Sequence, residues 1–185
     1  MKALRIFLFS AVGLIQLYVP TSMIWKREKT LKEGRVWKFR TAPVDPADAF
    51  RGRYIALGFV ADEVPRSKRL EAAGKIYAVL KEGADGFAEV ESLSLTRAAG
   101  DNVIEVGAGY WNDNIQNIEF PFNRYWVTEK IAPEAERAYA ANSRRQKQNA
   151  YLTVRVHDGD TAVEQLYIDN EPLADYLRAH SGAKK

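Results

Sequence analysis

The chain has 185 residues, of which 46% are hydrophobic and 28% are charged, which suits one globular domain plus a further segment and argues against long disordered stretches. The formal net charge of +3 includes Lys2 and Arg5, and without these two the chain carries 25 basic against 24 acidic side chains, too even a balance to attract nucleic acid. Cysteine is absent, which excludes disulfides, thiolate nucleophiles and cysteine-ligated metal centres.

The first predicted element is a helix from Ile6 to Trp25, a run of 20 residues without a formal charge. At about 1.5 Å per residue it would span roughly 30 Å, the thickness of the bilayer's hydrocarbon core. Pro20 predicts a kink near its far end, and Tyr18 and Trp25 suit the membrane interface. We therefore expect a membrane anchor over 1–25 that contacts the lipid bilayer. A cleaved signal peptide is the alternative, but the run lacks an Ala-x-Ala-like cleavage site.

The orientation of this anchor depends on the charges at its two ends. Lys2 and Arg5 give the short basic N-terminus of an export signal, which places the following domain outside the cytoplasm. The positive-inside rule favours the opposite orientation, because more basic residues follow the run: Lys26, Arg27, Lys29, Lys32, Arg35, Lys38 and Arg40. Since long domains translocate largely regardless of charge, we expect a single-pass inner-membrane protein with a juxtamembrane linker over 26–34 and a periplasmic domain over 35–185.

Short apolar and β-branched runs, separated by Gly, Pro and Asp, indicate strands along the rest of the chain. The clearest prediction is a hairpin in which Asp158 and Gly159 supply the positive φ angles of a tight turn. The predicted strands are 36–41, 53–61, 75–81, 87–95, 103–110, 118–126, 150–157 and 161–168.

Two helices are expected among these strands. Pro133 suits the first turn of a helix, and Ala135, Tyr139 and Asn142 follow at helical spacing. A short C-terminal helix is predicted from Pro172 to His180. The fold class is therefore α+β: a mainly antiparallel, barrel- or sandwich-like β-domain with one inserted helix, preceded by a transmembrane helix.

The segment 42–59 combines prolines, acidic residues and glycine. Asp45 is kept out of the helical region by Pro46, Asp48 can accept backbone hydrogen bonds, and Gly52 starts a strand. The segment is either a structural connection that leads into a core strand or a binding site. The candidate residues for both interpretations are Pro43, Asp45, Pro46, Asp48, Arg51, Gly52, Arg53, Tyr54, Leu57 and Phe59.

Two arginines in this segment, Arg51 and Arg53, project to the same side of an extended chain. They either pair with Asp45, Asp48 or Asp62, or form a small site for a carboxylate or a lipid phosphate. The abundance of nearby acids favours the internal pairing.

The residues from Gly52 to Phe59, Gly-Arg-Tyr-Ile-Ala-Leu-Gly-Phe, resemble the signature that gives the GDYXXLXY family of membrane-anchored proteins its name. Arg53 replaces the acidic position and Phe59 the final Tyr. The order along the chain agrees, with an N-terminal anchor, a Lys-Glu-Gly-Arg lead-in at 32–35 and a later Arg-Tyr-Trp-Val-Thr-Glu segment at 124–129. The resemblance implies a bacterial, membrane-anchored domain and assigns no reaction. Acid chemistry or metal binding at the acidic position cannot operate with Arg53.

No metal or cofactor motif is present in the sequence. His157 and His180 are the only histidines, and neither has a second ligand at the spacing of a zinc site. We expect no metal and no cofactor.

Two kinds of enzyme remain as alternatives. A hydrolase of the Ser/Lys kind would use Ser22 with Lys75 or Lys81. A carboxylate-based hydrolase would draw on Asp45, Asp48, Asp62 and Glu63. No motif surrounds either set, so an enzyme is the less favoured interpretation. We expect a membrane-anchored extracytoplasmic binding or assembly module with another membrane protein as partner, and an anchored hydrolase is the alternative.

Overall fold

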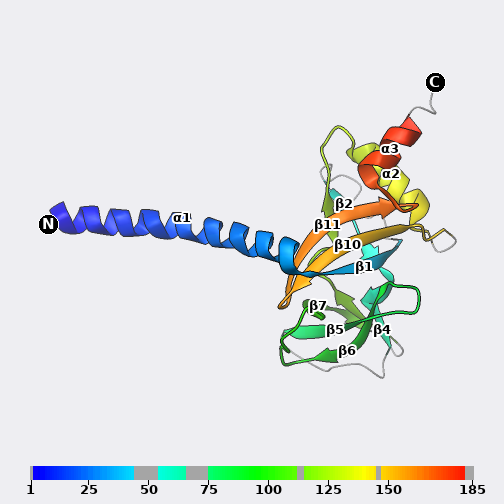
Figure 1. Ribbon diagram of the computed structural model, residues 1–185, viewed down its shortest axis with the longest axis horizontal. Coiled ribbons are helices and arrows are strands. Elements are labelled where there is room, and N and C mark those ends of the chain that lie inside the picture. The colour runs from blue at the N-terminus through cyan, green and yellow to red at the C-terminus, as the bar shows by residue number, and fades with distance from the viewer. Residues whose placement is uncertain (1, 44–53, 66–74, 112–114, 145–146, 182–185) are drawn as a thin grey trace.

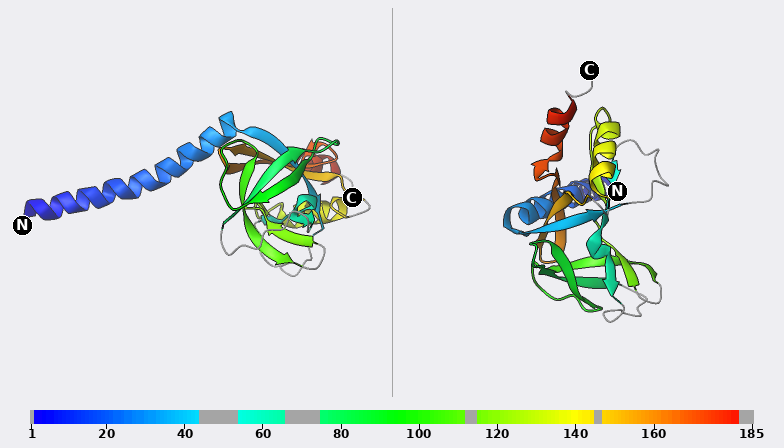
Figure 2. Two further views of the ribbon diagram at one scale, coloured as in Figure 1. Left: turned by 90° about the horizontal axis from the view of Figure 1, so that it is seen from below. Right: turned by 90° about the vertical axis from the view of Figure 1, so that its right-hand side faces the viewer.

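The computed structural model describes residues 2–43, 54–65, 75–111, 115–144 and 147–181. Helix α1 (Lys2–Glu33) projects from a β-rich domain and carries the N-terminus far from it (Figures 1 and 2). The helix is continuous through Pro20. Residues 26–33, expected as part of a linker, continue the helix, and its last turns contact the domain at two strands described below, β10 and β11. None of the described helices combines the length and the sustained apolar character that a membrane-crossing helix needs.

The junction between α1 and the domain is tightly built. Thr30 is buried, and its hydroxyl donates a hydrogen bond to the carbonyl of Lys26. The amide of Gly34 then donates to the carbonyl of Thr30. A Cβ at Gly34 would lie 2.5 Å from that same carbonyl oxygen and 3.0 Å from the carbonyl oxygen of Val156, so the close approach of α1 to the sheet requires glycine.

The first sheet runs antiparallel in the order β12-β11-β10-β1-β3. The predicted hairpin is confirmed at its centre, because Asp158 and Gly159 join β10 to β11 with φ angles of 46° and 79°. The strands of this sheet are β1 (Arg35–Ala42), β3 (Gly58–Phe59), β10 (Ala150–His157), β11 (Asp160–Ile168) and β12 (Glu171–Pro172).

The second sheet is also antiparallel and has the order β4-β8-β7-β5-β6. Its strands are β4 (Glu63–Pro65), β5 (Ile76–Glu82), β6 (Ala88–Ser94), β7 (Val103–Trp111) and β8 (Ile115–Glu119).

Two of the predicted strands are interrupted. Residues 53–61 were expected as one strand, but β2 (Tyr54–Ala56) and β3 are separate, and a 3-10 turn, η1 (Val60–Asp62), follows. Residues 118–126 divide into the end of β8 and β9 (Arg124–Trp126), which pairs with β2 in a small sheet. The two breaks face each other, since the amide of Leu57 donates to the carbonyl of Asn123 over 2.9 Å.

The two predicted helices are confirmed as α2 (Ala132–Asn142) and α3 (Leu173–Ser181), which contact each other. Pro133 occupies the first turn of α2, and Ala132, Ala135, Tyr139 and Asn142 form its buried face. α2 is inserted between β9 and β10, as the sequence predicted.

One hydrophobic core serves both large sheets. Phe39 of β1 lies at its centre, with ring centroids of Phe59, Phe120 and Phe122 at 5.8, 5.1 and 4.9 Å. The α+β class is therefore confirmed. The barrel alternative is wrong for the described residues, whose strands form open sheets with free edges, because the breaks near Leu57 and Asn123 divert strands instead of closing a ring.

Candidate functional site: a groove at the base of the long helix

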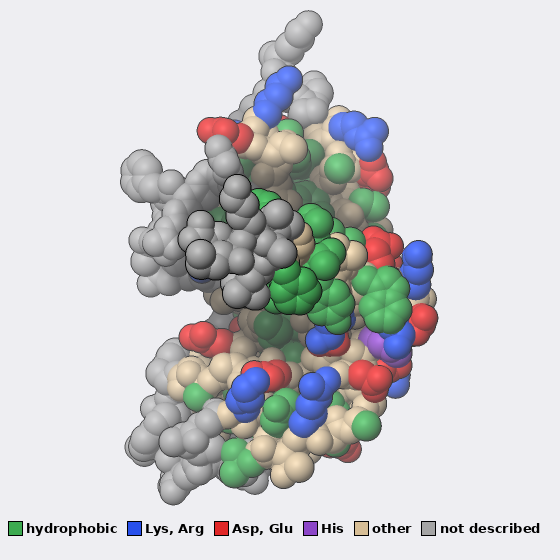
Figure 3. All heavy atoms as spheres, turned by 90° about the vertical axis from the view of Figure 1, so that its left-hand side faces the viewer, with side chains coloured by type: hydrophobic (Ala, Val, Ile, Leu, Met, Phe, Trp, Pro, Cys, Tyr) green, Lys and Arg blue, Asp and Glu red, His purple; other side chains and the backbone are tan. Residues whose placement is uncertain are grey.

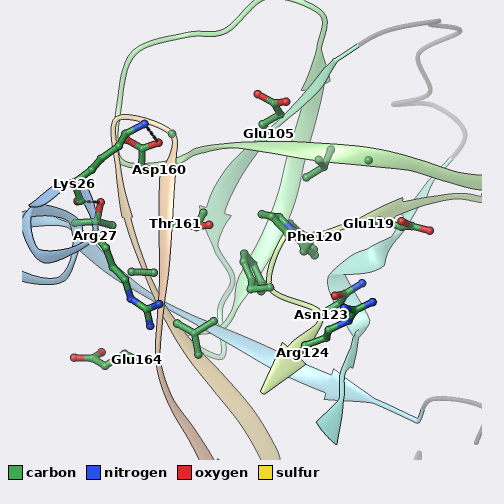
Figure 4. Close-up of a pocket in the computed structure, with 18 of the residues that line it drawn as sticks. Lys26, Arg27, Glu105, Glu119, Phe120, Asn123, Arg124, Asp160, Thr161 and Glu164 are labelled. Carbon is green, nitrogen blue, oxygen red and sulfur yellow. Dashed lines mark hydrogen bonds and ion pairs between the residues drawn. The ribbon is translucent and has the colours of Figure 1, made fainter. Parts of the chain in front are cut away.

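A groove of about 1340 Å³ opens where α1 meets the domain (Figure 4). The last turns of α1 form one side, with Met23, Lys26 and Arg27. The start of β11 and the segment that leads from β8 into β9 form the others. The close contact at Gly34 positions the α1 side, because it fixes where the helix leaves the sheet.

The charges in the groove are largely paired. Lys26 Nζ lies 2.7 Å from Asp160 Oδ1, and Lys75 Nζ lies 2.9 Å from Glu105 Oε1. Glu164 accepts from the guanidinium of Arg155 at 3.0 Å. Because each of these charges is paired, these side chains contribute little net charge to the groove.

Two arginines of the groove, Arg27 and Arg124, have no carboxylate partner in the part of the chain that the structure describes. The guanidinium of Arg124 lies over the ring of Tyr54, 5.0 Å from its centroid. The two side chains come from opposite walls, as Figure 4 shows. Glu119 also lines the groove and has no basic partner among the described residues, so one positive charge is left in excess once the internal ion pairs are made.

Aromatic side chains form the wall opposite α1. Phe120 and Phe122 are buried and stacked, with centroids 5.1 Å apart. Trp126 is 66% exposed, and its ring meets that of Tyr54 edge-on at 5.3 Å. In the view from the side on which α1 projects, apolar side chains gather where the helix lies over the domain (Figure 3). A large exposed Trp beside a groove is a feature of binding surfaces.

A second, smaller hollow of about 200 Å³ lies behind the β8–β9 segment. It shares Glu119, Phe120 and Asn123 with the groove. Glu119 points away from Phe120 (Figure 4), as neighbouring residues of an extended chain do. Asp62 and Leu57 line the far side of this hollow.

Asp62 is the most perturbed acid of the described residues. Burial raises the pKa of its carboxyl to about 7, and the nearby carboxylates of Glu119 and Glu63 add to this against the hydrogen bond from the Phe59 amide, which lowers it. That amide donates to Oδ2 over 2.8 Å. Oδ1 is buried and has no partner among the described residues.

The predicted site residues divide into two groups. Asp45, Pro46, Asp48, Arg51, Gly52 and Arg53 lie outside the described residues. Of the others, Leu57 and Phe59 are buried, Tyr54 is half-buried, and Pro43 is exposed after β1. Burial alternates here as it does along an extended chain, with Ile55, Leu57 and Phe59 buried and Ala56 exposed.

The residues proposed for a Ser/Lys hydrolase have other partners in the structure. The Ser22 hydroxyl donates to the carbonyl of Val19 within α1. Hydrogen bonding to Glu105 raises the pKa of Lys75, which is opposite to what a lysine base needs. Lys81 pairs with Glu89 at 3.2 Å.

Neither histidine forms part of a metal site in the described residues, where no group of three potential His or carboxylate ligands converges. His157 Nδ1 lies 3.3 Å from Asp101 Oδ1, and His180 stacks on Tyr176 at 4.1 Å. Asp62 points into the small hollow, whereas Glu63 is exposed on β4.

Sequence reasoning did not identify Arg27, Phe120 and Trp126 as members of one site. They are distant in the chain, and only the α1 junction and the β2–β9 pairing bring them to one groove. The run Asn123-Arg124-Tyr125-Trp126 mixes basic and aromatic residues, and this was the one available signal.

The protein is an α+β domain with a basic and aromatic groove at the base of a long N-terminal helix. A family model described as GDYXXLXY protein matches residues 16–166, and the chain belongs to this family. Searches of curated proteins and of solved structures found no match.

Proposed function

We propose that the chain is a membrane-anchored, extracytoplasmic binding or assembly module that holds its groove at the bilayer surface. The observation that carries the proposal is the exposure of large apolar side chains around α1. Five of them are Phe7, Phe9, Leu14, Tyr18 and Trp25, which are 69%, 82%, 69%, 73% and 70% exposed. Large apolar side chains exposed in this number along a helix are stabilised by an apolar environment.

The position of the groove supports the second part of the proposal. Trp25 ends the uncharged run, and Lys26 and Arg27 follow at once as groove residues. Aromatic and basic residues are typical of the boundary between lipid and water. With α1 in the bilayer, the groove therefore opens at the level of the lipid headgroups.

Another membrane protein is the expected partner, and α1 is the surface that would meet it. Gly13 has no heavy atom within 4 Å of an added Cβ, so a second helix has room to approach there. Small residues on membrane helices allow such close packing.

Membrane fractionation with a topology reporter tests the proposal. We expect the full chain to stay in the pellet after alkaline carbonate extraction, and alkaline phosphatase fused after Lys185 to be active. Release into the supernatant would contradict the anchor, and an inactive fusion that is well expressed would contradict the orientation.

An anchored hydrolase is the second candidate, and Asp62 is the observation that favours it. A carboxyl with a pKa of about 7 is partly protonated near neutral pH, as a general acid must be. Chromogenic glycosides provide the test at pH 6–7. Turnover that is lost in Asp62→Asn but retained in Glu63→Gln would support this candidate, and no turnover by the wild type would count against it.

A further inference from the structure

We propose that the groove at the base of α1 binds one anionic membrane lipid, with its phosphate held by Arg27 and its apolar part along the aromatic wall. The inference rests on the proposed function in one respect, which is that the bilayer supplies the lipid. The charges and aromatic residues of the groove do not depend on where the lipid comes from.

The charge left after internal pairing specifies the head of the ligand. Lys26, Lys75 and Glu164 are engaged with Asp160, Glu105 and Arg155. Arg27 and Arg124 remain, one on each wall, against one carboxylate, Glu119, that has no basic partner among the described residues and points away from Phe120. A guanidinium forms charge-assisted hydrogen bonds with phosphate oxygens, so a lipid phosphate complements Arg27. The excess positive charge of the groove disfavours a headgroup that adds a cation, as choline does, and favours one that is anionic overall.

The aromatic wall specifies the rest of the ligand. Trp126 is its exposed aromatic residue, and Phe120 and Phe122 line it as buried side chains that expose little surface. The volume of about 1340 Å³ exceeds the roughly 300–1,000 Å³ of common small-molecule pockets. A long apolar chain would fill this space, whereas a small anion would leave the aromatic side uncovered.

The groove is also placed where a bilayer lipid would reach it. Met23 and Arg27 are one helical turn apart on α1 and both line the groove. Met23 belongs to the uncharged run and Arg27 follows it. A lipid beside α1 would therefore present its chain near Met23 and its phosphate near Arg27.

Native mass spectrometry of the full chain in a neutral detergent tests the proposal. The probes are phosphatidylglycerol and phosphatidylcholine with identical acyl chains, added in equal amounts. We expect retention of phosphatidylglycerol over phosphatidylcholine. Arg27→Gln should weaken phosphatidylglycerol binding roughly tenfold, the value of one charge-assisted hydrogen bond, and Arg27→Lys should retain most of the binding.

Arg137→Gln is the matched control, because Arg137 is an exposed arginine on α2 whose Nε donates to the Pro133 carbonyl. It should bind as the wild type does. Equal retention of the two lipids, or unchanged binding in Arg27→Gln with Arg124→Gln, would overturn the proposal. Arg27-dependent binding of a second copy of the chain, or of another polypeptide, in place of lipid would also overturn the proposal. Carbonate extraction of the wild type is scored separately, since its failure removes the anchor and leaves lipid selectivity in detergent unaffected.

Discussion

The carboxyl of Asp62 destabilises the folded state when it is ionised. Its carboxyl is buried beside Leu57 in the small hollow, with one oxygen bonded to the Phe59 amide and the other unpartnered among the described residues. Burial disfavours the charged form and raises the pKa from 3.8 to about 7. Protonation of Asp62 therefore removes the free-energy cost of burying its charge.

The sign of the pH dependence follows from that raised pKa. Below pH 3.8 the group is neutral in the folded and unfolded states, and as pH rises towards 7 only the unfolded state ionises freely, so stability falls. Asp62→Asn keeps an acceptor for the Phe59 amide and removes the charge. We expect the variant to be more stable than the wild type at pH 8, with the gain shrinking towards pH 5.

Thermal unfolding of the full chain in neutral detergent, at several pH values, measures this difference. Glu63→Gln is the control, because Glu63 is exposed on the neighbouring strand. A gain for Asp62→Asn that is the same at pH 5 and pH 8 would show that ionisation of Asp62 is not its cause.

Leu57 tests whether the signature segment belongs to the core. It is 4% exposed and belongs to the hydrophobic cluster. Leu57→Ala should lower the free energy of unfolding by roughly 2–5 kcal/mol, as truncations of buried Leu do. Val60→Ala is the comparison, since Val60 is 46% exposed, and a loss at Leu57 no larger than at Val60 would place this segment outside the core.

At the scale of elements, the sequence predicted the regular parts and missed the breaks. The hairpin at Asp158 and the helix at Pro133 carry local signals, and both were found. The breaks in 53–61 and 118–126 depend on contacts between distant segments, such as Leu57 with Asn123. Pro121 and Asn123 are turn-forming residues at the second break and were available as a signal. The apolar and aromatic residues around both breaks concealed the change of partner strand, because the sequence pattern registers burial and not strand pairing.

The α1–β1 junction is the element-scale feature most open to test. A Cβ at Gly34 would meet the backbone carbonyls of Thr30 and Val156, neither of which can move without shifting the helix or the sheet. Gly34→Ala should destabilise the domain by roughly 1–3 kcal/mol, the usual cost of overpacking.

Gly13→Ala provides the matched control for this substitution. Gly13 lies in the same helix and has open space around an added Cβ, so the change should leave domain stability unaltered. The midpoint of thermal unfolding compares the two. Equal midpoints for Gly34→Ala and the wild type would mean that α1 meets the sheet more loosely than the structure has it.

At the scale of the whole molecule, the groove is a product of topology. Its walls come from α1, β11 and the β8–β9 segment, and no local sequence pattern predicts that these elements lie together. The sequence did predict an N-terminal helix ahead of an α+β domain, since the helix was inferred from a run without formal charge and the domain from local strand, turn and helix patterns. The groove arginines were not predicted, because which charges remain unpaired is decided by contacts such as Lys26 with Asp160.

Single-cysteine labelling tests the central claim, that α1 lies in a bilayer with the domain outside the cytoplasm. The chain has no cysteine, so Val12→Cys and Glu91→Cys each create one unique thiol, the first on α1 and the second on an exposed position of β6. In intact spheroplasts a membrane-impermeant maleimide should label Glu91→Cys and should label Val12→Cys only after denaturation. Labelling of Val12→Cys in intact spheroplasts as fast as Glu91→Cys, or of Glu91→Cys only after lysis, would contradict the account.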